Sequence, residues 1–413
     1  MAKPNLYLAA IDIGSSKVAV LIGHKDEAGG VEIVGKGCAA NRGTRKGSIV
    51  NVDATVEALK TAIEEAEVMA GTEISSAYVG IAGTDTRSVN SRGMVSVARK
   101  DREISRSDIK RVLEAAQSVA LPTDREILHA IPQEFIVDEQ GEIGEPLGML
   151  GNRLEVAVHL VTGNAARGKT LLTCVNRAGV EVEEIVFEPL ATAEAVLTHD
   201  EREMGVLLID IGAGTSEYAV FSEGEAQHSA VLPIGAGHFT NDLAMVLRTP
   251  FSEAERIKAQ QGCCLEGMVG DEEGISVPTV AGGPPRVIPR RQLCEILQPR
   301  ATELITLVQE DLERSGFSEE SLRGGVVLTG GGAQLDGLLE MTEEILNVGV
   351  RYGLPRGLGG LIDVISSPTW CTASGLLLYG QLADQNRKKQ SGFNGLTVKT
   401  VMGNLRGMFS DLL

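Results

Sequence analysis

Residues 9–22 read AAIDIGSSKVAVLI, and residues 208–221 read LIDIGAGTSEYAVF. Each stretch is an apolar run that ends in Ile-Asp-Ile-Gly, followed by small residues and a second β-prone run. The pattern predicts two strands joined by a tight turn, because glycine permits the turn and β-branched residues favour the strands. Taken singly, each stretch is also compatible with an unrelated β-hairpin. The repetition indicates the same structural unit twice in one chain.

Turns of this kind are suited to phosphate oxygens, because consecutive N–H groups and hydroxyls form a concave donor surface. Both first strands end in an Asp that is costly to bury unless a cation pairs with it, and a magnesium–phosphate group provides that pairing. P-loops and dinucleotide fingerprints differ, since they lead from a strand into a helix. The predicted phosphate contacts are Asp12, Gly14, Ser15, Ser16, Lys17, Asp210, Gly212, Gly214 and Thr215, with Asp12 and Asp210 also holding Mg2+ through water.

Composition narrows the class of protein. A chain of 413 residues with 43% hydrophobic residues is globular and long enough for two domains. A net charge of −18 and 3% aromatic residues argue against nucleic-acid binding. Six cysteines without CxxC spacing predict neither a zinc site nor a disulfide framework. We expect no signal peptide, since the first residues lead directly into a strand, and no stretch of about eighteen apolar residues that crosses a bilayer.

The order of elements predicts a ribonuclease-H-like half at each repeat. After the first hairpin come a third strand, a helix over 53–70 with Asp53 as its N-cap, and a fourth strand. Residues 85–163 then interrupt this half with β-prone segments and a helix that opens on a Ser105/Asp108 capping box. In the second half, residues 326–346 read as a strand, a glycine turn and a helix whose N-terminus favours negative charge. The glycine turn contributes Gly330, Gly331, Gly332 and Gln334 to the predicted nucleotide site.

These segments resemble the actin-like ATPase superfamily. Five segments stand in the expected order: IDIGSSK, FEPLATA, IDIGAGTS, LTGGGAQL and CTASGLLLYG. The resemblance implies an α/β, actin-like fold of two ribonuclease-H-like domains with ATP and Mg2+ between them. It also places Glu255 and Lys258, in the AERIK segment, at the ribose and base. The alternative for these two residues is an exposed i,i+3 ion pair.

The insertion at 85–163 and the segment GAGHFTNDLA are similar to the FtsA family of bacterial cell-division proteins. The PilM family of pilus-assembly proteins has a similar insertion and remains an alternative, as does an actin-fold phosphotransferase. The predicted units are a first domain at 1–84, completed by 164–198 and 366–384; the inserted α+β subdomain at 85–163; a second domain at 199–236 and 304–365 with a small subdomain at 237–303; a linker at 385–395; and a membrane-targeting helix at 396–413.

The C-terminal segment reverses the charge of the chain. Between residues 385 and 410 it has five basic residues and no acidic residue. On a helix, the apolar side chains of LTVKTVMGNLRGMFSDLL share a face of roughly 140°. Two glycines make this short helix marginal in water, so an anionic lipid surface is its predicted partner, and packing onto the core is the alternative. The predicted membrane contacts are Val401, Met402, Leu405, Arg406, Met408, Phe409 and Leu412.

The FtsA resemblance implies a protein that forms head-to-tail filaments and tethers FtsZ to the inner face of the cytoplasmic membrane at the division site. It implies that the FtsZ C-terminal tail binds the small subdomain, where Arg290 and Arg291 are either its partners or a solvated helix start. It also implies that later division proteins bind the inserted subdomain. We expect weak or no ATPase activity and assign no catalytic residue, because Phe187 stands where actins have a water-positioning Gln or Glu.

Overall fold

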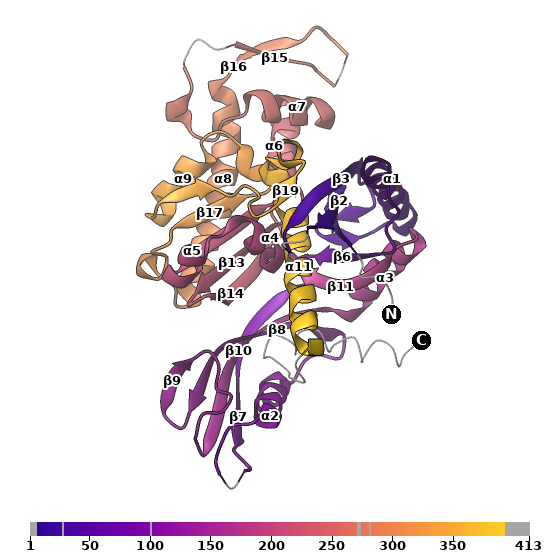
Figure 1. Ribbon diagram of the computed structural model, residues 1–413. Helices are drawn as coiled ribbons and strands as arrows, with labels where there is room; N and C mark the ends of the chain where they lie inside the picture. The colour runs from indigo at the N-terminus through magenta and orange to yellow at the C-terminus, as the bar shows by residue number, and fades with distance from the viewer. Residues whose placement is uncertain (1–5, 27–28, 100, 271–273, 281, 393–413) are drawn as a thin grey trace.

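The computed structural model describes residues 6–26, 29–99, 101–270, 274–280 and 282–392 (Figure 1). Two halves, each built on one sheet, lie on either side of helices α4 (Glu188–Val196) and α11 (Cys371–Gly392). A third unit hangs below them, at the lower edge of the view. The fold predicted from the two repeated hairpins is confirmed.

The first half is a six-stranded sheet in the order β11-β6-β1-β2-β3-β19. On β1, the side chains of Leu8 and Ala10 lie on one face of this sheet and those of Ala9 and Ile11 lie on the other, because successive side chains of a strand point to opposite faces. Helices α1 and α3 cover one face and α4 and α11 the other. The elements are β1 (Tyr7–Ile13), β2 (Lys17–Lys25), β3 (Val31–Ala40), β4 (Thr44–Arg45), β5 (Ser48–Ile49), α1 (Val52–Ala70), β6 (Ser76–Ile81), α3 (Ala165–Arg177), β11 (Glu181–Phe187) and β19 (Gly359–Gly360).

The predicted N-cap of α1 is wrong by two residues. Asn51 has the extended backbone of an N-cap, and its side chain accepts a hydrogen bond from the Ala54 N–H. Asp53 therefore lies in the first turn of the helix, where its negative charge is still favourable.

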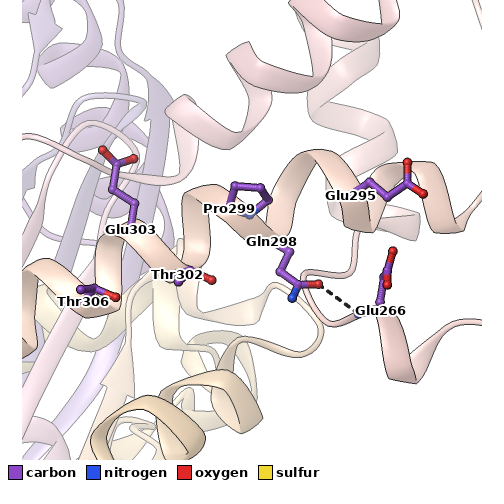
Figure 2. A pocket seen from close by; sticks show the side chains of 7 residues that line it. All are labelled: Glu266, Glu295, Gln298, Pro299, Thr302, Glu303 and Thr306. Atoms are coloured by element: carbon purple, nitrogen blue, oxygen red, sulfur yellow. Dashed lines mark hydrogen bonds between the residues drawn. The ribbon is translucent and has the colours of Figure 1, made fainter.

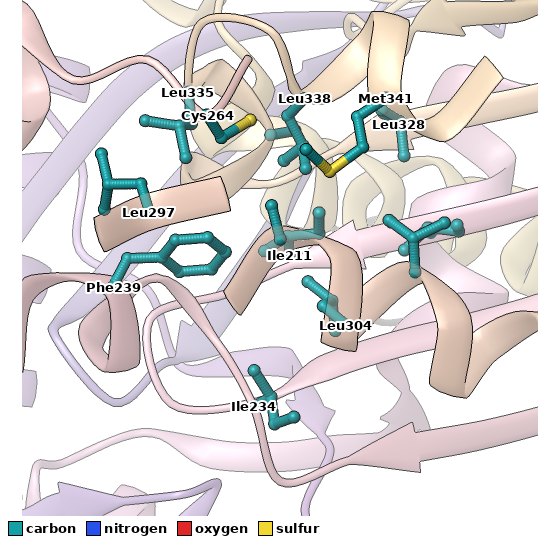
Figure 3. Packing of buried hydrophobic residues seen from close by; sticks show 14 of the residues in the cluster. Ile211, Ile234, Phe239, Cys264, Leu297, Leu304, Leu328, Leu335, Leu338 and Met341 are labelled. Carbon is teal, nitrogen blue, oxygen red and sulfur yellow. The ribbon is translucent and has the colours of Figure 1, made fainter. Parts of the chain in front are cut away.

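The second half repeats this plan in the sheet β14-β13-β12-β17-β18. Strand β12 pairs antiparallel with β13 and parallel with β17, as β1 pairs with β2 and β6. Ile211 packs with Phe239, Leu297 and Leu304 in its core (Figure 3). The elements are α5 (His199–Met204), β12 (Val206–Ile211), β13 (Ser216–Ser222), β14 (Glu225–Leu232), α6 (Ala236–Leu247), α7 (Phe251–Gln261), β15 (Gly274–Val277), β16 (Arg286–Pro289), α8 (Arg291–Arg314), β17 (Val326–Thr329), α9 (Leu338–Leu346), β18 (Val350–Tyr352) and α10 (Ile362–Ile365).

The inserted unit is a four-stranded antiparallel sheet in the order β7-β10-β8-β9 with one helix packed on it. The predicted capping box is confirmed, because Ser105 and Asp108 exchange hydrogen bonds at the start of that helix. The unit also contacts the second half: His159 Nε2 lies 2.9 Å from Ser229 Oγ on β14. Its elements are β7 (Arg87–Ser96), α2 (Arg106–Gln117), β8 (Arg125–Val137), β9 (Gln140–Ile143) and β10 (Arg153–Asn164).

Helices α4 and α11 cross in close contact between the two halves. A Cβ atom on Gly375 would come within 1.9 Å of the Ala191 carbonyl oxygen, so this crossing requires glycine. The predicted linker at 385–395 is wrong for 385–392, since α11 continues to Gly392. The Gln385 side chain donates to the Gly29 carbonyl oxygen, and the Arg387 side chain pairs with Glu183 on β11. These contacts with the first half hold the helix beyond the predicted end.

The predicted membrane-targeting helix at 396–413 lies outside the described residues. Within the ranges given above, no helix combines the length and the apolar character needed to cross a bilayer.

Candidate nucleotide-binding cleft

The turns of the two repeated hairpins face each other. A Cβ atom on Gly214, in the second turn, would lie 2.6 Å from Ser15 Oγ in the first. The Ser15 hydroxyl oxygen also accepts a hydrogen bond from the Gly47 N–H, at 3.1 Å. In the second turn the Gly212 carbonyl oxygen accepts from the Ala236 N–H at 2.8 Å, which ties it to the start of α6. Residues some 200 positions apart thus meet at one point between the halves.

Four carboxyl groups surround this point. Asp12 and Asp210 are the next-to-last residues of β1 and β12, Glu217 lies on β13 and Glu188 begins α4. Burial is the largest cause that raises the pKa of each: that of Asp210 to about 6, that of Glu217 to about 8, and those of Asp12 and Glu188 above their usual range. The mutual repulsion of the carboxylates raises the pKa values of Glu188, Asp210 and Glu217 further.

The charge at this point is incompletely balanced. Lys17 is the cation that lowers the pKa values of Asp12 and Asp210. Glu217 Oε1 has no hydrogen-bond partner among the described residues, although it is buried. A divalent cation fits here, because buried carboxylates need a compensating charge. No three metal-ligating side chains of the described chain are grouped to hold an ion directly, so phosphate and water oxygens would complete its shell.

The predicted glycine turn passes over the end of β12. Gly330 has φ +82°, and a Cβ atom there would lie 2.3 Å from Asp210 Oδ1. A Cβ atom on Gly332 would lie 2.4 Å from Ile211 Cγ2, whereas one on Gly331 would only reach ordinary contact with Thr369 at 3.4 Å. Gln334 is exposed at the end of this turn. Gly330 and Gly332 are therefore required by packing, and Gly331 is not.

The helix predicted directly after these glycines is wrong. A short 3₁₀ turn follows instead, over Gly331–Gln334, and α9 begins only at Leu338. Three residues, 335–337, separate this turn from α9, and Gly337, with φ +83°, turns the chain into the helix. The N-terminus of α9 is thus separated from the glycine turn.

Glu255 and Lys258 on α7 lie beside the second hairpin. Lys258 Nζ donates to the Ala236 carbonyl oxygen at 3.1 Å, to Thr240 Oγ1 at 2.8 Å and to Glu255 Oε2 at 2.8 Å. The N–H of the same Ala236 binds the second hairpin turn. The structure therefore connects this ion pair to the cleft through the first turn of α6.

Arg290 and Arg291 lie at the start of α8, and both are engaged within the chain. Arg290 Nε donates to the Gln261 carbonyl oxygen at 2.9 Å, and Arg291 pairs with Glu266 at 3.2 Å. Glu266 also lines a cavity of about 690 Å³ along α8, where its backbone N–H donates to Gln298 Oε1 (Figure 2). Three glutamates face this cavity; its lining is Glu266, Glu295, Gln298, Pro299, Thr302, Glu303 and Thr306.

Two acidic residues of this site, Glu188 and Glu217, are not among the residues predicted from the sequence. The prediction singled out Phe187, the neighbour of Glu188, instead. Phe187 is fully buried in a core and its N–H donates to His129 Nε2, so its side chain does not face the cleft. The side chain that does is Glu188, whose charge interacts with Asp12 and Asp210. Phe187 therefore gives no reason to expect that hydrolysis is absent. The signal was available in the sequence, because Glu188 directly precedes Pro189 in the predicted segment EPLATA.

The comparisons with family models agree with this architecture. Residues 207–375 match the model of the family described as "Cell division protein FtsA", and residues 83–162 match the one described as "SHS2 domain inserted in FTSA". The second match falls on the inserted four-stranded unit.

Curated relatives are similar over most of the chain. The cell division protein FtsA of Pseudomonas aeruginosa is 47% identical over 90% of this chain and 89% of its own length. The FtsA of Escherichia coli K12 is 38% identical over 92% of this chain and 91% of its own.

Solved structures share the fold at low identity. A PilM–PilN type IV pilus biogenesis complex matches with a TM-score of 0.65 at 16% identity, over 91% of this chain and 98% of that one. MreB5 of Spiroplasma citri, bound to ADP, matches with a TM-score of 0.58 at 14% identity, over 93% and 99%. At these identities the likeness is one of fold, so the structural match to PilM gives no functional support to the pilus-assembly alternative.

Proposed function

Because the chain belongs to the FtsA family of cell-division proteins, we propose that it binds ATP in its cleft, polymerises and tethers FtsZ to the inner face of the cytoplasmic membrane at the division site. The observation that carries the nucleotide part is the convergence of the two hairpin turns on Asp12 and Asp210. The family supplies the cell-division context. The proposed membrane attachment rests on the basic residues and the apolar helical face of the C-terminal segment.

In this proposal the phosphates of ATP lie between the two turns. The first turn donates through its N–H groups and through Ser15, Ser16 and Lys17, and the second through Thr215 and its backbone. A bound magnesium ion supplies the positive charge that the carboxylates lack, with Asp12 and Asp210 as its outer ligands through water. Glu255 and Lys258 lie toward the ribose and base, beside the glycine turn at 330–332.

Gly212→Asp tests this site. A carboxylate in the second turn would place a further acid against the phosphates, beside the group formed by Asp12, Glu188, Asp210 and Glu217. We expect loss of ATP binding in titration calorimetry with MgATP. Gly349→Asp is the matched control, because a Cβ atom there meets no atom within 4 Å and the backbone of Gly349 has no positive φ. Equal ATP affinity in the Gly212 variant and the wild type would overturn the assignment.

We propose that the small subdomain at 237–303 binds the FtsZ C-terminal tail and that the inserted subdomain binds later division proteins. Arg290 and Arg291 are candidates for the first contact. Since Arg291 is already paired with Glu266, an acidic segment would have to exchange with that glutamate. We expect Arg291→Glu to weaken FtsZ binding and Glu266→Gln to strengthen it. Unchanged affinity in both variants would remove this pair from the interface.

Membrane attachment is proposed to require assembly. A short helix with two glycines gives only marginal binding by itself, and linking many of them along a filament multiplies the affinity. Phe409→Glu puts a charge in the apolar face and is expected to release the protein from anionic vesicles. Thr400→Glu puts the same charge on the opposite face and is the control. If the Phe409 variant sediments with vesicles like the wild type, this segment is not the anchor.

A further inference from the structure

The turn that leads into α11 contacts both phosphate hairpins at once. Residues 369–372, called here the junction, end the short 3₁₀ turn Pro368–Trp370 and begin α11. Lys17, from the first hairpin, donates from Nζ to the Thr369 carbonyl oxygen at 2.7 Å. Asp210, from the second hairpin, accepts at Oδ2 from Thr372 Oγ1 at 3.0 Å. The expected phosphate-binding cation and the expected metal-binding anion are therefore held by the same four residues.

The junction contacts Lys17 through a backbone carbonyl and an aromatic ring. Lys17 Nζ lies 4.6 Å from the centroid of the Trp370 ring, which is only 7% exposed. An ammonium against an indole face is favourable, the more so where water is excluded. The bond to Thr369 uses one of the three N–H donors of the ammonium. The remaining donors are available for phosphate oxygens.

The Asp210 side is built from two hydroxyls of the other half. Thr372 on α11 and Thr192 on α4 lie 3.1 Å apart, and both donate to Asp210 Oδ2, Thr192 at 3.4 Å. All three side chains are buried. These hydrogen bonds fix one carboxylate oxygen, and they leave Oδ1, which lies beside Gly330, for another partner.

We propose that the junction is a positioning element of the nucleotide site. The Thr369 carbonyl and the Trp370 ring hold the Lys17 ammonium in place for phosphate oxygens, and the Thr372 hydroxyl orients the Asp210 carboxylate for the metal-bound water. Binding is favoured because side chains held in advance lose less freedom when the ligand arrives. This inference rests on the proposed ATP site and adds residues that the sequence pattern of the hairpins does not include.

Three variants separate this positioning role of Thr372 from a role in packing alone. Valine has the shape of threonine without its hydroxyl, so Thr372→Val preserves packing and removes the bond to Asp210. Thr372→Ser keeps the hydroxyl and removes only a methyl group. Thr342→Val is a matched control, because Thr342 is also buried but donates to the Leu338 carbonyl oxygen within its own helix, at 2.7 Å.

The first test measures ATP affinity of the full chain by calorimetry across a Mg2+ titration. A hydrogen bond to a charged group contributes about 1.5–3 kcal/mol, so Thr372→Val should raise the half-saturating Mg2+ concentration roughly tenfold or more. Thr372→Ser and Thr342→Val should stay within about twofold of the wild type. Wild-type Mg2+ dependence in a folded Thr372→Val variant would overturn the inference. A wild-type protein that binds no MgATP would overturn both this inference and the proposed ATP site.

The second test needs no change in the junction, since Trp370 is the single tryptophan of the chain. Addition of MgATP should shift its emission, because phosphate charge reaches the ammonium that lies against its ring. Lys36→Met should preserve the shift, although Lys36 Nζ lies 4.9 Å from the same ring, because Lys36 is on β3. MgATP binding by calorimetry without any emission change would contradict contact between Lys17 and the phosphates.

Discussion

Gly330→Ala is the substitution whose effect on the cleft follows most directly from the structure. Gly330 has φ +82° and ψ 166°, a backbone conformation that side-chain-bearing residues almost never adopt. Its new Cβ atom would lie 2.3 Å from Asp210 Oδ1 and 2.6 Å from the Ile211 carbonyl oxygen. Both atoms belong to the end of β12, which is buried in the sheet. Neither can move without displacing the proposed metal-binding carboxylate.

The expected magnitude has two parts. Backbone strain of this kind costs about 1–3 kcal/mol, and overpacking of a filled site costs about 1–3 kcal/mol more. Gly330→Ala should therefore lower the free energy of unfolding by about 2–6 kcal/mol and weaken ATP binding, because Asp210 is displaced. Gly331→Ala, one residue on, should change stability by less than about 1 kcal/mol, since its Cβ atom meets only Thr369 Cγ2 at 3.4 Å.

The assay is urea denaturation followed by circular dichroism, with ATP affinity measured on whichever variants are folded. The comparison between neighbouring glycines removes general effects of replacing glycine in this turn. Equal stability of the Gly330 and Gly331 variants would refute the reasoning. An unaltered ATP affinity in a destabilised Gly330 variant would separate the glycine turn from nucleotide binding.

Three further predictions concern buried groups. Burial lowers the pKa of His129 from 6.5 to about 4. Between pH 6.5 and pH 4 this imidazole is therefore protonated in the unfolded chain and neutral in the folded chain. Stability should therefore decrease as pH falls from about 6.5 to 4, by on the order of 3 kcal/mol for this group, and His129→Gln should flatten that slope in urea titrations at each pH. Glu188→Gln should slow any ATP hydrolysis about 100-fold or more while ATP binding persists, because a neutral amide cannot act as a base; single-turnover rates equal to the wild type would exclude Glu188. Gly375→Ala should unfold at lower urea concentration than Gly349→Ala, because its Cβ atom collides with Ala191 whereas the one on residue 349, whose φ is not positive, meets open space; the reverse order would contradict the close crossing of α4 and α11.

The overall architecture could be predicted because it is encoded locally and twice. Ile-Asp-Ile-Gly followed by a second β-prone run specifies a hairpin at each repeat, and β12 and β13 pair as β1 and β2 do. The start of α2 was equally accessible, since Ser105 and Asp108 form a capping box from residues three apart. Such signals depend only on neighbouring residues.

The errors arise where distant contacts decide. Helix α11 continues past its predicted end, where Gln385 binds Gly29 in the turn between β2 and β3 and Arg387 binds Glu183 on β11, both remote in sequence. The roles of Thr192 and Thr372 could not be read from the sequence either, because only the crossing of α4 and α11 brings them to Asp210. Glu217 became visible as part of the site for the same reason, whereas Glu188 could have been identified from its place in EPLATA.

The central claim is that this chain connects FtsZ to a membrane, and vesicle sedimentation tests it most directly. Purified FtsZ is mixed with anionic vesicles, MgATP and either the full chain or a chain that ends at residue 395. We predict that FtsZ sediments with the vesicles only in the presence of the full chain, and that FtsZ without its C-terminal tail stays in the supernatant. Sedimentation of FtsZ to the same extent with the shortened chain, or none with the full chain, would contradict the account.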